Sequence, residues 1–418
     1  MRVHFLGACQ EVGRSAFAVE LDQKYVLLDY GVLMNREVGF PAHISPKELD
    51  SIIISHAHLD HSGLLPIFYL HDNIPLYGVE PSFQLIDLLI RDFLNISSYL
   101  LPFEYIDLEN MMERCVNLPY GRQFNRLGAT ITLLNAGHIP GSCQVLIETD
   151  SKRLLYTGDF NTVPTKLLGA ADLDYGDLDG VIIESTYATD EHPDRAKMEE
   201  EFILRATEIV KDGGTVLVPA FGVGRSQEII SILAARHFKY PVYVDGMALK
   251  TIHILEAYED SLRDPELFKT AIRNAEWIGN WKDRRKAANT PSVIVSPAGM
   301  LKGGSAVFYL EQVAKQKKNG IFLVSFQIPG TPGSILLERR KFMFKGRTRK
   351  VEAQVMKFDF SSHVGKNELH QVLQSLDPRT KVFAVHGAEE NCKSLASYAK
   401  KELGLDASAP HAGGVFEI

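Results

Sequence analysis

Several side chains that bind metals well lie close together in the stretch IIISHAHLDHSGLLP, residues 52–66. They are His56, His58, Asp60 and His61. The apolar, β-branched run before them predicts a buried strand, and the loop after such a strand is where α/β proteins usually carry their chemistry. Imidazole and carboxylate groups suit zinc and similar first-row metals. The spacing therefore predicts metal binding in this loop.

Other strand-like runs also end in a residue that can bind a metal. These residues are Asp29 in YVLLDYG, His138 in LLNAGHIPGS, Asp159 in LLYTGDF and His386 in KVFAVHG. Taken alone, a histidine or a turn carboxylate of this kind is more often structural than a ligand. Together with the first cluster, however, the set exceeds the ligands that a single zinc ion takes. The pattern therefore favours two metal ions.

The elements that must position these residues follow from the hydrophobic pattern. Residues 1–190 alternate short β-rich runs with turn signals, and PSFQLIDLLIRDFLNISSYL has apolar residues at helical spacing. We therefore expect an αββα sandwich. Residues 191–348 alternate helices with buried strands, which predicts a parallel-sheet α/β unit. Short strands ending in polar residues return over residues 349–418, so the middle unit is expected to be inserted into the first domain.

The composition is that of an ordinary globular protein. The 418 residues are 45% hydrophobic and 23% charged, which makes two domains the prior expectation. The chain has no apolar run long enough for a membrane span, and MRVHFLGACQEVGRS lacks the apolar region of a signal peptide. The four cysteines form no CxxC pair, so neither a disulfide framework nor a cysteine zinc site is indicated. We expect a cytoplasmic protein.

Charge is distributed unevenly along the chain. The net charge of −7 argues against a basic surface everywhere, yet RRKFMFKGRTRK at residues 339–350 contains no acidic residue. A solvated face is the ordinary explanation of such a run. The other explanation is a contact with a polyanion, for which Arg347 and Arg349 are the candidates.

The motifs taken together resemble the metallo-β-lactamase superfamily. The histidine cluster is followed by GH at His138, TGD at Asp159 and a late HG at His386. ESTY with Glu184, SSHVG with His363 and the inserted α/β segment narrow the resemblance to the β-CASP branch. HAHLDHSG, and ESTY followed by HPDR, look like the nuclease subunit of the cleavage and polyadenylation specificity factor and its prokaryotic relatives.

The resemblance implies roles for individual residues. His56, His58 and His138 would hold one zinc ion; Asp60, His61 and His386 would hold the other; Asp159 would bridge them. Asp29 would support the ligands from behind. Glu184 and His363 would lie beside the scissile phosphate, with His363 as the general acid and Glu184 as its orienting partner. Asp60 is counted with these two as catalytic.

The same resemblance implies a ribonuclease that hydrolyses phosphodiester bonds of single-stranded RNA with water activated by two zinc ions. Endonucleolytic cutting is the leading mode and 5′ to 3′ exonucleolytic digestion the second. The Gly-rich turn before a predicted helix, with Gly222, Gly224, Arg225 and Ser226, would offer N–H groups to a phosphate. A homodimer is implied by the resemblance alone.

Two other functions were weighed. A small-molecule metallohydrolase shares the metal cluster, but the large insertion with its basic runs is hard to explain for a small substrate. A non-catalytic RNA-binding scaffold would lack some metal ligands, and no ligand position is substituted in this sequence. We therefore expect a nuclease.

Overall fold

The structure is a computed structural model that describes residues 1–34, 38–71, 73–97, 100–328, 330–344 and 346–418. It divides into two compact units. Unit 1 contains residues 1–164, 169–191 and 362–418, and unit 2 contains residues 165–168 and 192–361. None of the helices in the described ranges is long and apolar enough to cross a membrane.

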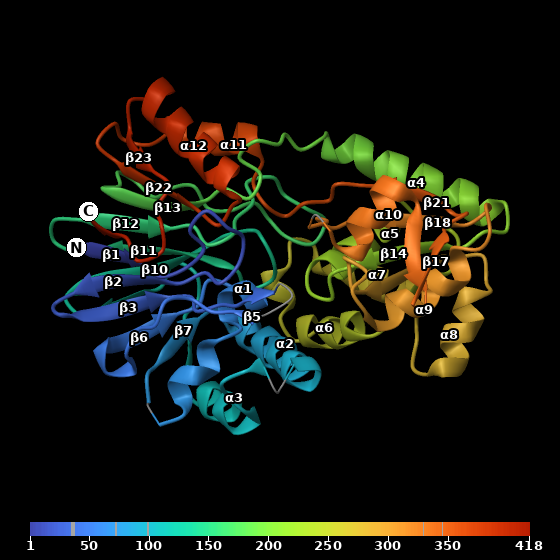
Figure 1. The fold of residues 1–418 in the computed structure, drawn as a ribbon, viewed down its shortest axis with the longest axis horizontal. Coiled ribbons are helices and arrows are strands. Elements are labelled where there is room, and N and C mark those ends of the chain that lie inside the picture. The colour runs from blue at the N-terminus through green and yellow to red at the C-terminus, as the bar shows by residue number, and fades with distance from the viewer. Residues whose placement is uncertain (35–37, 72, 98–99, 329, 345) are drawn as a thin grey trace. The chain divides into compact units, whose positions relative to one another are not determined.

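Unit 1 contains two seven-stranded sheets. The first has the order β24 (Val415–Glu417), β1 (Arg2–Phe5), β2 (Phe17–Leu21), β3 (Lys24–Leu28), β6 (Leu49–Ile53), β7 (Leu76–Gly78) and β8 (Cys115–Asn117). The second has the order β23 (Asp406–Ser408), β22 (Lys381–Val385), β13 (Gly180–Glu184), β12 (Arg153–Tyr156), β11 (Cys143–Glu148), β10 (Ala129–Asn135) and β9 (Gln123–Arg126). The two termini lie side by side because β1 and β24 pair (Figure 1).

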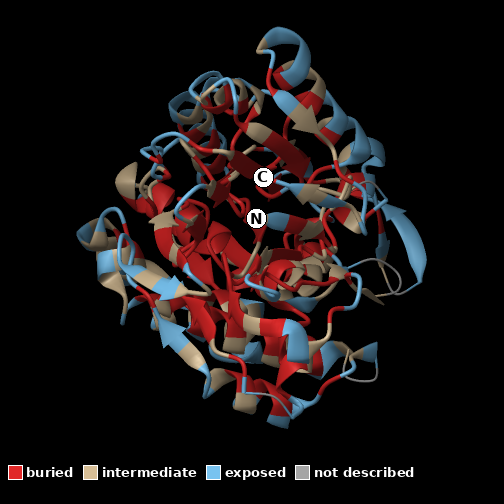
Figure 2. Cartoon of the chain, turned by 90° about the vertical axis from the view of Figure 1, so that its left-hand side faces the viewer, coloured by how far each residue is buried: buried red, intermediate tan, exposed pale blue. Residues whose placement is uncertain are grey.

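The packing of unit 1 follows from the two-residue period of its strands. Val3 and Phe5 of β1 share one core with Ile131 and Leu133 of β10, so the inner faces of the two sheets meet. The other face of the second sheet packs against α11 (Lys366–Gln374) and α12 (Glu389–Glu402). In Figure 1, α2 (Glu80–Ser97) and α3 (Tyr105–Met112) lie on the opposite side of the unit from α11 and α12. Figure 2 shows buried residues concentrated in the interior. The predicted αββα sandwich is confirmed.

Unit 2 contains a six-stranded sheet in which every adjacent pair of strands is parallel. Its order is β16 (Ala275–Trp277), β15 (Val242–Val244), β17 (Val293–Pro297), β14 (Val216–Ala220), β18 (Gly320–Leu323) and β21 (Gln354–Lys357). Helices cover both faces: α4 (Arg195–Lys211), α5 (Arg225–Ala235), α6 (Met247–Leu255) and α7 (Pro265–Asn274) contribute to one core, and α8 (Trp281–Ala288), α9 (Gly304–Val313) and α10 (Pro332–Arg339) to the other. The predicted parallel-sheet insertion is confirmed.

The chain returns to unit 1 later than the expected boundary after residue 348. Strand β21 pairs in parallel with β18, from Gly320 opposite Gln354 to Leu323 opposite Lys357. Its hydrogen bonds therefore extend the sheet of unit 2, and the chain passes back between Ser361 and Ser362. Before β21, the strands β19 (Lys341–Phe344) and β20 (Arg347–Lys350) form an antiparallel hairpin. The sequence of a short strand does not show which sheet it joins, because its partner strand is set by the tertiary structure.

Candidate metal centre

The strands of unit 1 bring the predicted ligands together beyond the carboxyl ends of the strands that precede them. β12, β13 and β22 are mutually parallel, and β10 has the same direction because both it and β12 are antiparallel to β11. Likewise β3 and β6 are parallel. The seven predicted metal ligands, Asp29 and Glu184 each follow, or end, one of these strands, so segments far apart in sequence deliver their side chains to the same place. His363 lies instead in the segment between β21 and α11.

One group of side chains consists of His56, His58, His138 and Asp159, each of which offers a ligand atom within 4.8 Å of the others. Nε2 of His56 lies 3.2 Å from Nδ1 of His58, and Nε2 of His138 lies 3.2 Å from the same atom. Nδ1–H of His138 donates to the carbonyl of Ser362 at 2.9 Å, which leaves Nε2 with its lone pair toward the group. These imidazoles therefore present nitrogen atoms to a common point.

A second group consists of Asp60, His61 and His386. Nε2 of His386 lies 3.3 Å from Nε2 of His61 and 3.4 Å from Oδ2 of Asp60. Asp159 lies between the two groups: its Oδ2 is 3.6 Å from Nε2 of His56 and 3.4 Å from Nε2 of His61, and its Oδ1 is 3.1 Å from Nδ1 of His386. Its two oxygens thus lie close to histidines of both groups.

Asp29 fixes His61 from behind. Its carboxylate accepts hydrogen bonds from Nδ1–H of His61 at 2.7 Å, from the hydroxyl of Tyr156 at 2.6 Å, and from the amide and hydroxyl of Ser55, both at 2.7 Å. Because Nδ1 of His61 is engaged, Nε2 is left for a metal. Asp29 and His386 both adopt the left-handed backbone region, with φ of 57° and 49°. Non-glycine residues in this region collect at functional sites.

Sequence reasoning missed the residues that hold the ligands in place. Ser55 and Tyr156 bind Asp29, and the hydroxyl of Thr186 donates to Oε2 of Glu184 at 2.6 Å. All of them lie inside the motifs ISHAH, LLYTGD and ESTY, one or a few positions from a residue that was identified. Serine, threonine and tyrosine are so common in strands and turns that their presence near a ligand does not by itself predict a supporting role.

Burial makes most of these histidines neutral. It lowers the pKa of His56 and of His138 well below the usual value, and lowers the pKa of His58 to about 4. A neutral imidazole is the form that binds a metal. For His61, burial acts in the same direction, but the carboxylates of Asp159 and Asp29 outweigh it and raise the pKa well above its usual value. The field that favours a proton there also favours a divalent cation.

Glu184 and His363 form a separate pair beside Asp159. Nδ1–H of His363 donates to Glu184, with distances of 3.1 Å to Oε1 and 3.0 Å to Oε2. Glu184 also accepts from the amide of Phe160 at 2.9 Å. Although Glu184 could also join a metal group with Asp159 and His386, both of its oxygens already accept hydrogen bonds. This arrangement orients the His363 ring.

The charge of His363 suits an acid. Burial alone would lower its pKa, but the carboxylates of Glu184 and Asp159 outweigh burial and raise the pKa to about 9. The ring therefore carries a proton at neutral pH. Its side chain is 21% exposed, whereas that of Glu184 is 1% exposed. His363 is thus the member of the pair that a substrate can reach.

The donor set fits divalent metal ions. Asp159 is 2% exposed, and its Oδ1 accepts no hydrogen bond in the described part of the chain. A buried carboxylate oxygen without a hydrogen bond is costly unless a cation balances it. Nitrogen and oxygen ligands in groups of three or four also match the numbers that zinc takes from proteins. Bound metal therefore accounts for an arrangement that would otherwise be unfavourable.

The predicted phosphate-binding turn is more enclosed than expected. Gly224 precedes α5 with φ of 78°, as a glycine at a helix start can. The amides of Arg225 and Ser226, however, donate to the carbonyls of Val223 and Phe221, at 3.0 and 3.1 Å. The Ser226 hydroxyl donates to Phe221 as well. These groups are occupied within the turn, and its RNA-binding role, with that of Gly222, stays a prediction.

The basic hairpin is open to solvent. Arg347 and Arg349 lie on β20, all of whose residues are exposed. They stand opposite Phe344 and Phe342 of β19, so their side chains leave the same face of the hairpin. No carboxylate among the described residues forms an ion pair with either arginine.

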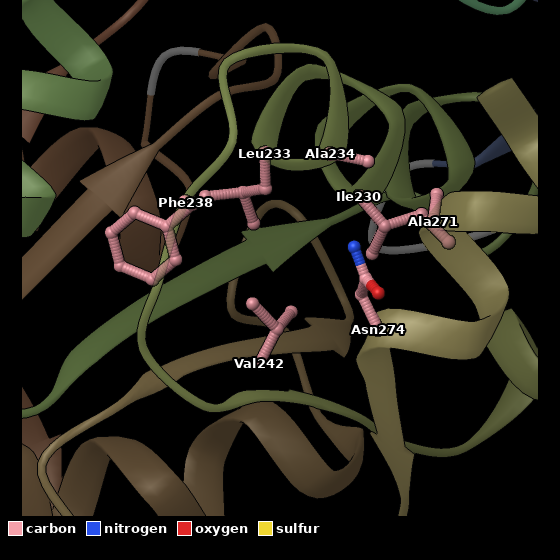
Figure 3. A pocket seen from close by; sticks show the side chains of 7 residues that line it. All are labelled: Ile230, Leu233, Ala234, Phe238, Val242, Ala271 and Asn274. Atoms are coloured by element: carbon pink, nitrogen blue, oxygen red, sulfur yellow. The ribbon is translucent and has the colours of Figure 1, made fainter.

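A small cavity lies within unit 2 (Figure 3). Its lining consists of Ile230, Leu233, Ala234, Phe238, Val242, Ala271 and Asn274. The side chains are apolar except for one amide, so the cavity offers no group for catalysis and is a gap in the core between α5, α7 and β15.

Three family models match successive parts of the chain. The metallo-beta-lactamase superfamily model matches residues 10–196, the Beta-Casp domain model matches residues 226–336, and the model of the Zn-dependent metallo-hydrolase RNA specificity domain matches residues 348–410. A crystal structure of a protein of unknown function from Enterococcus faecalis V583 superposes with a TM-score of 0.64 and 13% identity over 99% of both chains. That likeness concerns the fold alone.

Curated relatives match over nearly the whole chain. RNase aCSPSF2 of Saccharolobus solfataricus is 38% identical over 98% of this chain and 83% of its own length. Probable RNase MJ4 of Methanocaldococcus jannaschii is 35% identical, with all of both chains covered. Transcription termination factor FttA of Pyrococcus abyssi is 35% identical over 98% of this chain and 70% of its own length.

Proposed function

The chain belongs to the β-CASP branch of the metallo-β-lactamase superfamily and is a metal-dependent ribonuclease, and from this premise we propose that it cuts single-stranded RNA internally with two zinc ions. The observation that carries the proposal is the position of Asp159 between two groups of histidines. His56, His58 and His138 would hold one ion, and Asp60, His61 and His386 the other.

The bound ions would supply an activated water and neutralise charge on the phosphate. The chain's own residues do the rest. Asp29 holds His61 with Nε2 toward the centre, and Ser362 does the same for His138 through its carbonyl. Both contacts fix the ring orientation before RNA arrives, so no reorganisation is needed during the reaction.

We assign the proton for the leaving oxygen to His363. Its Nδ1–H donates to Glu184, so we assign the transferred proton to Nε2–H. When the bond from phosphorus to the leaving oxygen breaks, that oxygen takes this proton, and His363 becomes neutral. Glu184 does not take part in the transfer; it holds the ring and favours the protonated form.

The basic hairpin is the proposed backbone contact. Replacing Arg347 and Arg349 together by alanine is expected to weaken RNA binding and to make its dependence on log salt concentration shallower, by about 0.7 per lost phosphate contact on a single strand. Titrations at several salt concentrations measure this slope. Lys211→Ala combined with Lys239→Ala removes the same charge from exposed positions of unit 2. Equal slopes in the two double variants would make the hairpin an ordinary solvated face.

The cutting mode is tested with two RNAs of the same single-stranded sequence, one linear with a 5′ label and one circular. The zinc-loaded protein is expected to cut both, because an endonuclease needs no end. Release of 5′ mononucleotides from the linear RNA with the circle intact would instead assign 5′ to 3′ exonucleolytic digestion. Metal analysis of the same preparation tests the identity and number of the ions, and light scattering tests the homodimer implied by the resemblance.

A further inference from the structure

Both tryptophans of the chain lie in one connection of unit 2 and are exposed. Trp277 ends β16 with 37% of its surface exposed, and Trp281 begins α8 with 57% exposed. Tryptophan is highly buried on average, because its large ring gains much from leaving water. Two exposed tryptophans four positions apart therefore indicate a surface that meets a partner.

The ring of Trp281 contacts an arginine whose partner is a buried carboxylate. The guanidinium of Arg284 lies over it, 4.8 Å from its centroid, and Phe308 meets it at 85° with 5.2 Å between centroids. Arg284 in turn donates two hydrogen bonds to the carboxylate of the fully buried Asp245, from Nε at 2.8 Å and from Nη2 at 3.0 Å. A flexible surface arginine would not fix a neighbour, but this one is anchored in the core.

Further contacts make the same region rigid. Asp245 also accepts from the hydroxyl of Tyr309 at 2.8 Å. At the start of α8, the side chain of Asn280 accepts from the amides of Lys282 and Asp283, at 2.8 and 3.1 Å, which fixes the first turn. The exposed ring therefore has its orientation set in advance, and a ligand that stacks on it need not bear the cost of ordering it.

The charges on α8 favour an anionic partner. Lys282 and Arg285 are exposed, and no carboxylate of the described residues forms an ion pair with either. The acidic residues nearby are already engaged: Asp283 accepts from Asn280 at 2.8 Å, and Glu276 pairs with Lys286 at 3.3 Å. An exposed aromatic face beside free cations is how proteins bind single-stranded nucleic acid, whose bases stack and whose phosphates are negative.

We propose that Trp281, supported by Trp277, is a platform on which bases of single-stranded RNA stack, with Lys282 and Arg285 contacting the adjoining phosphates. This inference rests on the proposed function, because it takes RNA as the partner. It adds a second part to the RNA-binding surface, which contacts the aromatic faces of the bases. Since every base has such a face, the platform binds RNA without selecting a sequence. Arg284 is a positioning residue that acts through Trp281.

The test compares RNAs with and without bases. Full-length protein carrying Asp159→Ala, in which the RNA is not expected to be cut, is titrated with oligoadenylate and with an abasic RNA of equal length, and gels confirm that the RNA stays intact. With Trp281 present, removal of the bases is expected to weaken binding by roughly fivefold or more. With Trp281→Ala this difference should largely disappear, and with Trp281→Phe most of it should return. Leu204→Ala, a change at an apolar residue 54% exposed on α4, is the matched control and should leave the difference unchanged.

A second readout uses fluorescence. In Trp277→Phe the only remaining tryptophan is Trp281, so stacking should quench the emission as oligoadenylate is added. An equal effect of base removal in Trp281→Ala, or no quenching while RNA binds, would overturn the platform. If one of these outcomes is found and the wild-type protein still cuts RNA, the platform is wrong but the proposed function stands. If the platform is found but the wild-type protein cuts no RNA, the proposed function fails instead.

Discussion

Replacing Asp159 by alanine is expected to abolish RNA cleavage and to reduce the bound metal. The oxygens of Asp159 lie within 3.6 Å of histidines of both groups, so its loss is expected to affect both ions. Changing an outer partner of a metal ligand already costs about 10- to 100-fold in affinity or activity, and we expect a loss of more than about 100-fold for this residue. Cleavage rates and metal content per chain measure the two effects, and circular dichroism checks the fold.

Asp174→Ala is the matched control, because Asp174 is an exposed aspartate of unit 1. It should keep both activity and metal. His58→Ala should have the same effects as Asp159→Ala, since Nδ1 of His58 lies 3.2 Å from Nε2 of His56 and 3.2 Å from Nε2 of His138. Unchanged turnover in either of these two variants would remove the residue from the metal centre.

The second large effect is expected at His363. His363→Ala should keep its metal but slow cleavage by about 10²- to 10⁴-fold, the usual contribution of a general acid. The reason is that the leaving oxygen would depart without a proton. His71→Ala, at an exposed histidine of unit 1, should leave the rate unchanged.

A modified RNA separates the acid from other roles of His363. A bridging sulfur in place of the leaving oxygen departs readily as a thiolate and needs no proton. His363→Ala should therefore cut this RNA at close to the wild-type rate, and preparing it in the 3′ and 5′ forms identifies which oxygen leaves. If the variant remains equally slow on both forms, His363 has a different role. If it loses metal, His363 acts as a ligand.

The fold could be predicted because both units are built from strongly patterned elements. Alternation along β1, β2 and β10 places apolar residues on one face, and the helix–strand rhythm after residue 191 is typical of a parallel sheet. The pairing of β21 with the sheet of unit 2 could not be predicted from the sequence, because its four residues are compatible with a strand in either unit. The glycine-rich turn before α5 likewise gave no sign that its own carbonyls occupy its amides.

The sequence by itself determined which side chains could serve as ligands, because His56, His58, Asp60 and His61 are close in the chain and the others end strands. Only the tertiary structure decided how they are arranged. Parallel strands bring Asp159 between the two groups, and Asp29 and Ser55 set the orientation of His61. Glu184 helps to raise the pKa of His363. These are contacts between segments up to hundreds of residues apart, and their energies depend on burial and distance. A linear pattern records residue types and spacing, whereas the fold supplies the geometry that gives each of them its chemistry.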